Sequence, residues 1–152
     1  MILYRFGDIL SSGADIICQQ VNCQDTMGSG LAKEIRDNFP SCYEGYKMFR
    51  AGKTPSVLLG KVNWVQDNHG PIFANIFAQL RYGRSEDGHF SYTALRNGLT
   101  EVCTHAMAHN RSVAIPHGIS CGCGGGDWEI VSNIIEEVFG GGNVRCEVWK
   151  LQ

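Results

Sequence analysis

The chain has 152 residues, of which 43% are hydrophobic, and its formal net charge at pH 7 is −2. This length suits one domain with a sizeable core, and the near-neutral charge argues against binding to bulk nucleic acid. The apolar runs are shorter than the ~20 residues that cross a membrane, and the N-terminal residues lack the basic and apolar regions of a signal peptide, so a soluble, non-secreted protein is expected.

Six largely apolar runs have the length of strands, and several are nearly continuous, as in strands that are covered on both faces. These runs are Ile2–Phe6, Ala14–Val21, Ser56–Val65, Ile72–Ala78, Ser112–Ile115 and Val144–Trp149. Between them, four segments repeat apolar residues with the period of a helix. These segments are Leu31–Phe39, Ser41–Arg50, Tyr92–Ala108 and Asp127–Phe139. The alternation predicts one α/β domain over residues 1–152, with helices on both faces of a mostly parallel sheet.

The sequence contains seven cysteines, an odd number in a domain large enough to be stable without disulfides. Reduced thiols and a cytoplasmic location are therefore predicted. Cys121 and Cys123 are separated by a single residue, whereas structural zinc sites favour about two to four intervening residues and a second pair of ligands. We therefore expect neither a metal nor a cofactor.

Two glycine-rich segments, Cys18–Leu31 and Ile115–Trp128, each follow a strand-like run and lead into a helix-like run. Glycine lets backbone N–H groups approach a ligand without an intervening Cβ atom, and the start of a helix adds partial positive charge. Two such loops in one small domain predict a diphosphate that is held from both sides. The first loop lacks the third glycine of a dinucleotide-binding fingerprint and the Gly-Lys-Ser/Thr of a P-loop.

Short motifs along nearly the whole chain occur in the order found in one known family. They are Gly7-Asp8-Ile9, Asn22, Gly28-Ser29-Gly30-Leu31-Ala32, Asn75–Gln79 with Tyr82-Gly83, Tyr92-Thr93-Ala94-Leu95, Ile115-Pro116 and Gly122–Trp128. Each motif is weak alone, but together they resemble the macrodomain (ADP-ribose-binding) family. The arrangement is most similar to its small stand-alone branch, which includes ADP-ribose 1″-phosphate phosphatases and enzymes that remove ADP-ribose from proteins or DNA.

The resemblance implies a three-layer α/β/α fold with a mixed, mostly parallel central sheet and a cleft at the strand ends for ADP-ribose or a derivative. Asp8, with Ile9 beside it, matches the family aspartate that accepts a hydrogen bond from the adenine amino group; a turn or helix-capping role is the alternative. Asn22 matches the asparagine that faces the distal ribose, where an amide can both donate and accept. The alternative is that Asn22 only ties down the loop that follows it.

The resemblance also assigns the two glycine-rich loops to the diphosphate, through their backbone N–H groups. The first loop contributes Gly28, Ser29, Gly30 and Leu31, and the second contributes Ser120, Cys121, Gly122, Cys123 and Gly124. The second loop is one residue longer than the usual family form, and Ser120 replaces a frequent glycine, so its register is defined to within one position. The rings of Phe77, Tyr82 and Trp128 are candidates to stack on adenine or ribose, with core packing as the alternative for Trp128.

Family members that act through a covalent lysine intermediate carry that lysine near the Asn75–Gln79 strand end and an aspartate in the second loop. Here the strand ends in Phe77-Ala78-Gln79, and the matching loop position is near Gly124. Asp127 is predicted to cap the following helix instead. A Schiff-base mechanism cannot run without its amine, so that mechanism is rejected.

Hydrolysis of a phosphomonoester needs charge stabilisation and a positioned water more than a covalent group. The candidates to orient that water are Asn22, Asp25, Gln79 and His117. His117 could also act as an acid or be only a surface residue. Cys121 is a further candidate, as a nucleophile near a helix start, but no base partner is visible in the sequence.

The predicted function is binding of ADP-ribose or a derivative and hydrolysis of its terminal group, with the 1″-phosphate of ADP-ribose 1″-phosphate as the first candidate. One alternative is a reader module that binds ADP-ribose, free or attached to a macromolecule, without turnover. Another is an ADP-ribosyl hydrolase that acts without a catalytic lysine. An enzyme for a different nucleotide diphosphate would prefer another base, contrary to the role predicted for Asp8.

Overall fold

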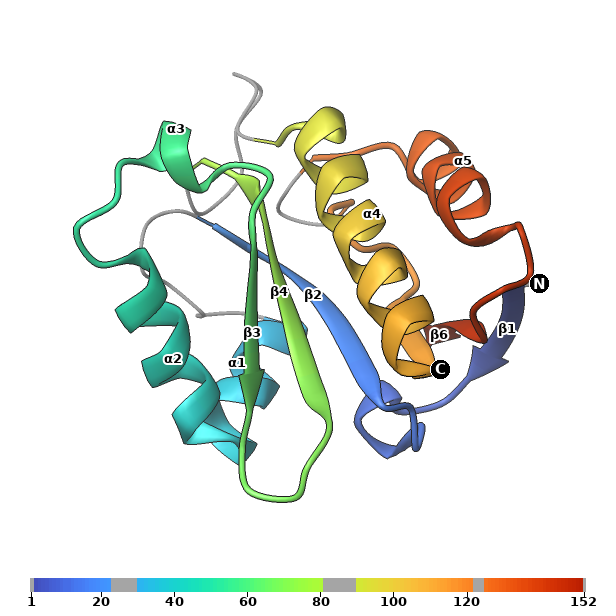
Figure 1. Cartoon of the computed structure of the whole chain (residues 1–152), viewed down its shortest axis with the longest axis horizontal. Helices are drawn as coiled ribbons and strands as arrows, with labels where there is room; N and C mark the ends of the chain where they lie inside the picture. The colour runs from blue at the N-terminus through green and yellow to red at the C-terminus, as the bar shows by residue number, and fades with distance from the viewer. Residues whose placement is uncertain (1, 23–29, 81–89, 122–124, 152) are drawn as a thin grey trace.

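The computed structural model describes residues 2–22, 30–80, 90–121 and 125–151. Six strands within these residues form one sheet. In spatial order the strands are β1 (Ile2–Phe6), β6 (Cys146–Lys150), β5 (Val113–Pro116), β2 (Ile16–Asn22), β4 (Ile72–Gln79) and β3 (Val62–Gln66). Neighbouring strands run parallel, except that β3 is antiparallel to β4. The predicted mixed, mostly parallel sheet is confirmed (Figure 1).

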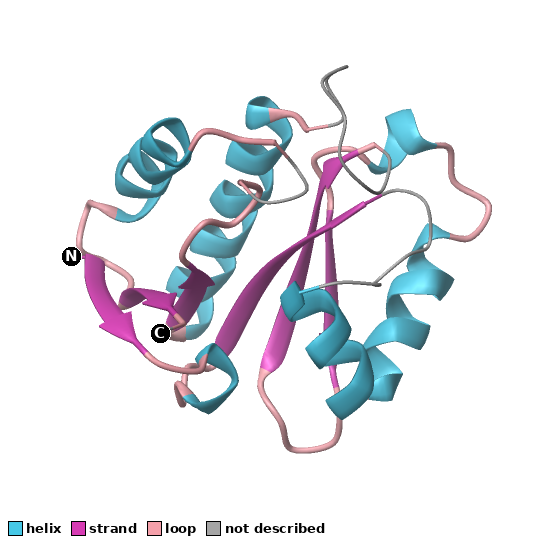
Figure 2. Ribbon diagram, turned by 180° about the vertical axis from the view of Figure 1, so that it is seen from behind, coloured by secondary structure: helices cyan, strands magenta, loops and turns pink. Residues whose placement is uncertain are grey.

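Helices cover both faces of this sheet (Figures 1 and 2). The helices on one face are α1 (Gly30–Asn38), α2 (Pro40–Arg50) and the short α3 (Pro55–Leu58), and those on the other are α4 (Tyr92–His109) and α5 (Trp128–Phe139). A short 3-10 helix, η1 (Ile9–Ser11), connects β1 to β2. The buried apolar side chains form one cluster on each face, which confirms the three-layer α/β/α fold. Among the described residues, no helix is long and apolar enough to cross a membrane.

The central strands β2 and β4 explain the nearly continuous apolar runs in the sequence. Successive side chains of a strand point to opposite faces, and here helices cover both faces. In β4 every residue from Phe73 to Gln79 is buried, and in β2 so are Ile16, Ile17 and Cys18. These two strands therefore form the rigid centre from which the loops at their ends extend.

The predicted strand Ser56–Val65 is correct only in its second half. Residues Pro55–Leu58 form α3, and β3 begins at Val62. Proline suits the first position of a helix because its φ is already helical and its missing N–H would have no partner there. The same effect places the start of α2 at Pro40, one residue before the predicted start at Ser41.

Helix α4 packs so closely on β4 that a side chain at Gly98 would have no room. A Cβ atom there would collide with Ile76 Cγ2. We expect Gly98→Ala to lower the free energy of unfolding by about 1–3 kcal/mol, because overpacking outweighs the better helix propensity of alanine. Urea unfolding measures the change. Gly141→Ala is the control, since a Cβ there meets no atom within 4 Å in the part of the chain that the structure describes; equal effects of the two variants would contradict this close packing.

The cysteines that the structure describes are free thiols, namely Cys18, Cys42, Cys103, Cys121 and Cys146. Burial raises the pKa of Cys42 and of Cys146 to about 12, so both stay protonated at neutral pH. These two side chains therefore act as small apolar core residues.

Candidate ligand-binding site at the strand ends

The chain leaves two adjacent strands, β2 and β5, in opposite directions. From β2 it continues through α1, α2 and α3 to β3 and β4 on one side, and from β5 it continues through α5 to β6 on the other. In open α/β sheets, ligands bind in the crevice that such a switch creates beyond the carboxyl ends of the strands. We call the edge formed by the carboxyl ends of β1, β6, β5, β2 and β4 the switch edge, and the candidate site lies there.

The switch edge brings together side chains that are far apart in the sequence. Asp8 follows β1, Asn22 ends β2, Gln79 ends β4 and His117 follows β5, and all four strands run parallel within the sheet. Asn22 and Gln79 are direct partners in the β2–β4 pairing. The structure thus places the predicted adenine, ribose and catalytic residues along one edge of the sheet.

Asp8 is exposed immediately after β1 and caps η1. Its Oδ1 accepts a hydrogen bond from the backbone N–H of Leu10 at 3.0 Å. The capping role is therefore present, and a carboxylate keeps a second oxygen that can accept from a ligand. Ile9 is buried against the core cluster under α1 and α2, so its side chain serves the fold, and a ligand-binding role for Ile9 stays a prediction.

The turn after β1 rests on the last strand of the chain. Gly7 has a φ of +137°, and a Cβ atom there would lie 3.1 Å from a ring carbon of Trp149. The Trp149 indole donates to Glu147 Oε1 at 3.0 Å, while Arg145 and Arg5 donate to Oε2 at 3.0 and 3.4 Å. A nearly buried carboxylate thus fixes the indole that supports the turn.

The pKa of Glu147 yields a pH-dependent prediction. Burial raises this pKa, but the hydrogen bonds from Trp149, Arg145 and Arg5 outweigh burial, so the net pKa lies below its ordinary value. The ionised carboxylate therefore stabilises the fold at neutral pH, and this stabilisation is lost as the pH falls through the lowered pKa of the folded state. We expect Glu147→Gln to cost about 1–2 kcal/mol of unfolding free energy at pH 7 and much less near pH 3.

Urea unfolding of the Glu147→Gln variant at the two pH values measures that difference. Glu137→Gln is a suitable control, because Glu137 is 60% exposed in its ion pair with Arg96 and surface pairs contribute little. If Glu147→Gln destabilised the protein as much near pH 3 as at pH 7, the ionised Glu147 carboxylate would not be the source of the stabilisation.

Two amide side chains at the switch edge are held through their oxygen atoms. The phenol oxygen of Tyr46, from α2, lies 3.0 Å from Asn22 Oδ1 and 2.8 Å from the Asn22 backbone oxygen. The Oε1 atom of Gln79 accepts from Gln20 Nε2 at 2.7 Å. Both Asn22 and Gln79 are buried, with 9% and 5% of their surface exposed. Their positions are therefore fixed by the fold before any ligand arrives.

The described part of the second loop is held by its own backbone. The N–H of Cys121 donates to the Gly118 oxygen, and the N–H of Gly126 donates to the Ser120 oxygen, both at 2.8 Å. Ser120 has a φ of +69°, the left-handed region that glycine adopts most readily. Ser120, which replaces a frequent family glycine, therefore has the backbone conformation that a glycine would adopt. Among the described residues, its buried Oγ has no hydrogen-bond partner.

His117 packs against the first residue of α5. Its ring centroid lies 4.3 Å from that of Trp128, and its backbone N–H donates to the Trp149 oxygen at 2.7 Å. Burial, together with the charge of Lys150, lowers the pKa of His117, so the imidazole is neutral at pH 7. A neutral ring favours a hydrogen-bonding role over the role of an acid. Trp128 also contacts the core cluster under α4 and α5, the alternative considered from its sequence.

The thiol of Cys121 is not activated. Burial, together with the charge of Asp127, raises the pKa of Cys121 to about 11, and its Sγ donates to the Ile119 oxygen at 3.3 Å. A protonated thiol is a weak nucleophile, so the structure disfavours covalent catalysis by this residue. Asp127 caps α5 as predicted, with its Oδ1 accepting from the backbone N–H of Glu129 at 2.9 Å.

The first loop is described only from the start of α1. Gly30 is exposed with a φ of +59°, and Leu31 is half-buried against the core cluster under α1 and α2. The other assigned loop residues and two further candidates lie outside the described residues, namely Gly28, Ser29, Gly122, Cys123, Gly124, Asp25 and Tyr82. Their predicted roles stay predictions.

The stacking role considered for Phe77 is wrong. Its ring is fully buried, 5.7 Å from the ring centroid of Tyr46 and 5.7 Å from that of Phe49. The alternation of the strand points this residue to the face that α2 covers, so it packs in the core and cannot reach a ligand at the edge.

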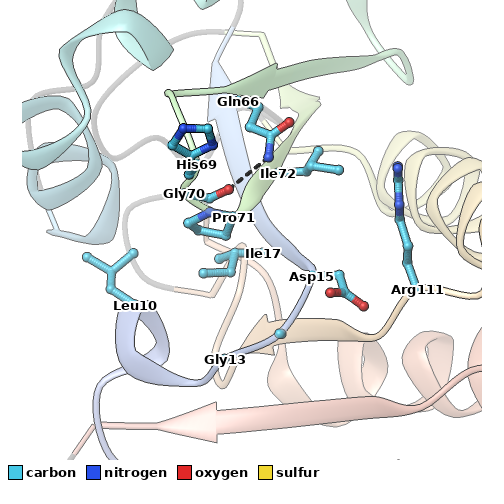
Figure 3. Close-up of a pocket in the computed structure, with 11 residues that line it drawn as sticks. Leu10, Gly13, Asp15, Ile17, Gln66, His69, Gly70, Pro71, Ile72 and Arg111 are labelled. Carbon is cyan, nitrogen blue, oxygen red and sulfur yellow. Dashed lines mark hydrogen bonds between the residues drawn. The ribbon is translucent and has the colours of Figure 1, made fainter.

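A surface pocket of about 510 Å³ lies at the opposite edge of the sheet, near the amino ends of β2 and β4 (Figure 3). Polar side chains on its wall are already bonded within the protein. Asp15 accepts from the backbone N–H of Ser112 at 2.8 Å, and Gln66 donates to the Gly70 oxygen at 2.9 Å. No predicted ligand-binding residue is among the described residues that line this pocket, so the candidate site remains at the switch edge.

Sequence reasoning missed Tyr46 and Gln20, the two residues that hold the candidate amides. Tyr46 occupies an apolar position of the α2 pattern and therefore has the signature of an ordinary core residue. Gln20 was visible as a polar residue inside a buried strand, which is the signal that could have singled it out.

No protein-family model matches the sequence. Over 142 residues the chain is 28% identical to a Mycobacterium tuberculosis protein named DNA ADP-ribosyl glycohydrolase, and the match covers 91% of this chain and 39% of that protein. The chain thus spans about two fifths of the length of this curated relative.

Solved structures resemble the chain over nearly its full length. A Bacteroides thetaiotaomicron protein of unknown function superposes with a TM-score of 0.86 at 28% identity, covering 99% of this chain and 98% of the other. The macrodomain of Mycobacterium tuberculosis DarG gives a TM-score of 0.81 at 25% identity, with 98% and 97% covered. The fold is an α/β/α domain, and its candidate site lies at the strand ends. Within that class the chain has the fold of a macrodomain, which agrees with the resemblance of its motifs.

Proposed function

We propose that the switch edge binds ADP-ribose or a derivative, with the adenine at Asp8, the distal ribose at Asn22 and the diphosphate along the two glycine-rich loops. The observation that carries this proposal is the meeting of Asp8, Asn22 and the second loop at one edge of the sheet, beside the switch between β2 and β5. The Mycobacterium tuberculosis relative, which is named for an ADP-ribosyl substrate, supports the same class of ligand.

The chemistry of Asp8 supports selection of adenine. Its carboxylate accepts hydrogen bonds, so it suits the exocyclic amino group of adenine and disfavours the carbonyl oxygen that hypoxanthine carries at the same position. The exposed position of Asp8 after β1 leaves its carboxylate at the surface of the edge. Binding should therefore weaken when the amino group of the base is replaced by a carbonyl.

We also propose that the protein hydrolyses the group on the distal ribose, with the 1″-phosphate as the first candidate. Water would replace the phosphate, so that ADP-ribose 1″-phosphate and water give ADP-ribose and inorganic phosphate. Asn22 and Gln79 are neutral amides that can hold a water or phosphate oxygens, and His117 offers a neutral imidazole nearby at the same edge. This route does not require the lysine that some members of the resembled family carry near the end of this strand.

A second candidate reaction is hydrolysis of the bond between ADP-ribose and a macromolecule. The name of the Mycobacterium tuberculosis relative favours ADP-ribosylated DNA, and this chain matches about two fifths of that protein. The free thiols among the described cysteines support a reducing, cytoplasmic setting for such a partner. A reader without turnover remains the alternative if ADP-ribose binds and no group is released.

One preparation tests the two reactions. Binding of ADP-ribose is first measured by calorimetry. Two assays then measure the release of phosphate from ADP-ribose 1″-phosphate and the release of ADP-ribose from an ADP-ribosylated oligonucleotide. Release of phosphate alone supports the first candidate, and release of ADP-ribose alone supports the second. Asn22→Ala is the site variant and should lose most of the turnover. Binding without either release would refute both hydrolytic proposals and favour the reader.

A further inference from the structure

The surface pocket near the amino ends of β2 and β4 is lined by two opposite charges (Figure 3). Arg111, in the connection from α4 to β5, and Asp15, just before β2, both line this cavity of about 510 Å³. Within the described part of the chain, neither side chain forms an ion pair, with the other or with a further residue. Both charges are therefore open to a third group in the cavity.

Arg111 is held by a neutral partner and not by a carboxylate. Its Nη1 lies 2.9 Å from His105 Nε2, and a guanidinium has only donors, so the imidazole nitrogen must accept. His105 Nε2 then carries no proton, and the ring is neutral. Burial, together with the charges of His109 and Arg111, lowers the pKa of His105, which agrees with a neutral ring. The contact fixes the guanidinium without compensating its charge.

The support of Arg111 is itself well fixed. The ring of His105 lies 4.2 Å from the indole of Trp64 on β3 and 4.4 Å from the ring of His109, measured between centroids. The backbone N–H of Arg111 donates to the Ala106 oxygen at 3.0 Å, where α4 ends. A side chain that is held at its backbone and at its head loses little conformational freedom when it binds a ligand.

Asp15 is held by the residue that follows Arg111 in the chain. Its Oδ2 accepts from the backbone N–H of Ser112 at 2.8 Å and from the Ser112 hydroxyl at 3.2 Å. These bonds place the carboxylate beside the same stretch of chain that carries the guanidinium. Among the described residues, no hydrogen bond engages Asp15 Oδ1, so this oxygen can accept from a ligand.

We propose that this pocket is a second ligand site, separate from the switch edge, for a small zwitterion such as an α-amino acid. Arg111 donates to the carboxylate of the ligand, and Asp15 accepts from its ammonium group. The half-buried side chains of Leu10, Pro71 and Ile72 line the same pocket and contact the apolar part of the ligand. A pure anion would be repelled by Asp15, and a pure cation would be repelled by Arg111.

The test uses L-phenylalanine and two analogues that each lack one charge. N-acetyl-L-phenylalanine has no positive charge, and L-phenylalaninamide has no negative charge. NMR titration of the Arg111 Nε–H and of the backbone amides around the pocket measures each dissociation constant. We expect saturable binding of phenylalanine at about 1–5 mM, the range for a ligand of this size. Each analogue should bind at least about fivefold more weakly, because it loses one charge-assisted contact.

Two variants assign the two charges of the ligand to their partners. Arg111→Gln should lose the preference for phenylalanine over its amide, because the partner of the carboxylate is gone. Asp15→Asn can still accept from Ser112, and it should lose the preference for phenylalanine over the N-acetyl analogue. Arg96→Gln removes an arginine that pairs with Glu137 away from this pocket, so it should keep both preferences.

The comparison of the three probes on the wild-type chain decides the proposal even if a variant fails to fold. No saturable shift with phenylalanine would overturn it, and so would equal binding of the three probes. Tighter binding of the N-acetyl analogue than of phenylalanine would indicate a simple anion site and would overturn the zwitterion. Preferences that persist in folded Arg111→Gln and Asp15→Asn would remove these residues from the site. The probes do not involve ADP-ribose, so failure here leaves the proposed function intact.

Discussion

Replacement of Asp8 by alanine is expected to weaken ADP-ribose binding about 5- to 150-fold, which corresponds to the roughly 1–3 kcal/mol lost when a buried polar group is deprived of its partner. The bound adenine amino group would lose its acceptor at the end of β1. Calorimetric titration of the folded variant measures the loss.

Asp8 also caps η1, so the two roles must be separated. Asp8→Asn is the matched variant, because an asparagine oxygen can still accept from the Leu10 N–H and cap the 3-10 helix. An amide nitrogen cannot accept from adenine, so Asp8→Asn should keep the stability of the wild type and still bind ADP-ribose more weakly. Unchanged affinity in both variants would remove Asp8 from the site.

Replacement of Gly30 by valine is the second change for which we expect a large effect, with a loss of ADP-ribose affinity of at least about tenfold. A Cβ atom at Gly30 would meet no atom of the described residues within 4 Å. Any loss of binding beyond that caused by backbone strain therefore reports on the space that the diphosphate needs beside the start of α1. Titration with ADP-ribose, together with thermal unfolding, measures both effects.

Gly52→Val is the matched control for backbone strain. Gly52 has a φ of +75°, close to the +59° of Gly30, and a Cβ there also lies more than 4 Å from the atoms of the residues described. Gly52 follows α2 in the sequence and is not among the residues assigned to the ligand. Both variants should lose similar stability, but only Gly30→Val should lose affinity. Equal affinities in the two folded variants would show that the first loop is misassigned.

The architecture could be predicted from the sequence because it depends on periodicity. The continuous apolar runs of β2 and β4 and the four-residue spacing in the helices report burial directly. The prediction was wrong where local chemistry overrides hydrophobicity. The apolar residues after Pro55 have the pattern of a strand, but a proline at the first helical position and Gly60 with a φ of +91° break that strand into α3 and a turn.

The candidate site was only partly predictable. Asp8, Asn22 and Gln79 were found because their motifs resemble those of a known family, and the sheet topology then places them on one edge. Tyr46 could not be found in this way, because its contact with Asn22 joins a helix to a strand end 24 residues away and nothing local marks it. The burial of the Phe77 ring could not be predicted from the sequence either, since a strand residue in a motif can face either the core or the ligand.

The most direct test of an ADP-ribose site at the switch edge is a calorimetric titration of the wild-type chain with ADP-ribose. The same titration is run with the analogue that carries hypoxanthine in place of adenine. We predict saturable binding of one ADP-ribose per chain and clearly weaker binding of the hypoxanthine analogue. No saturable binding of ADP-ribose, or equal binding of the two ligands, would contradict a site at the switch edge in which Asp8 reads the base.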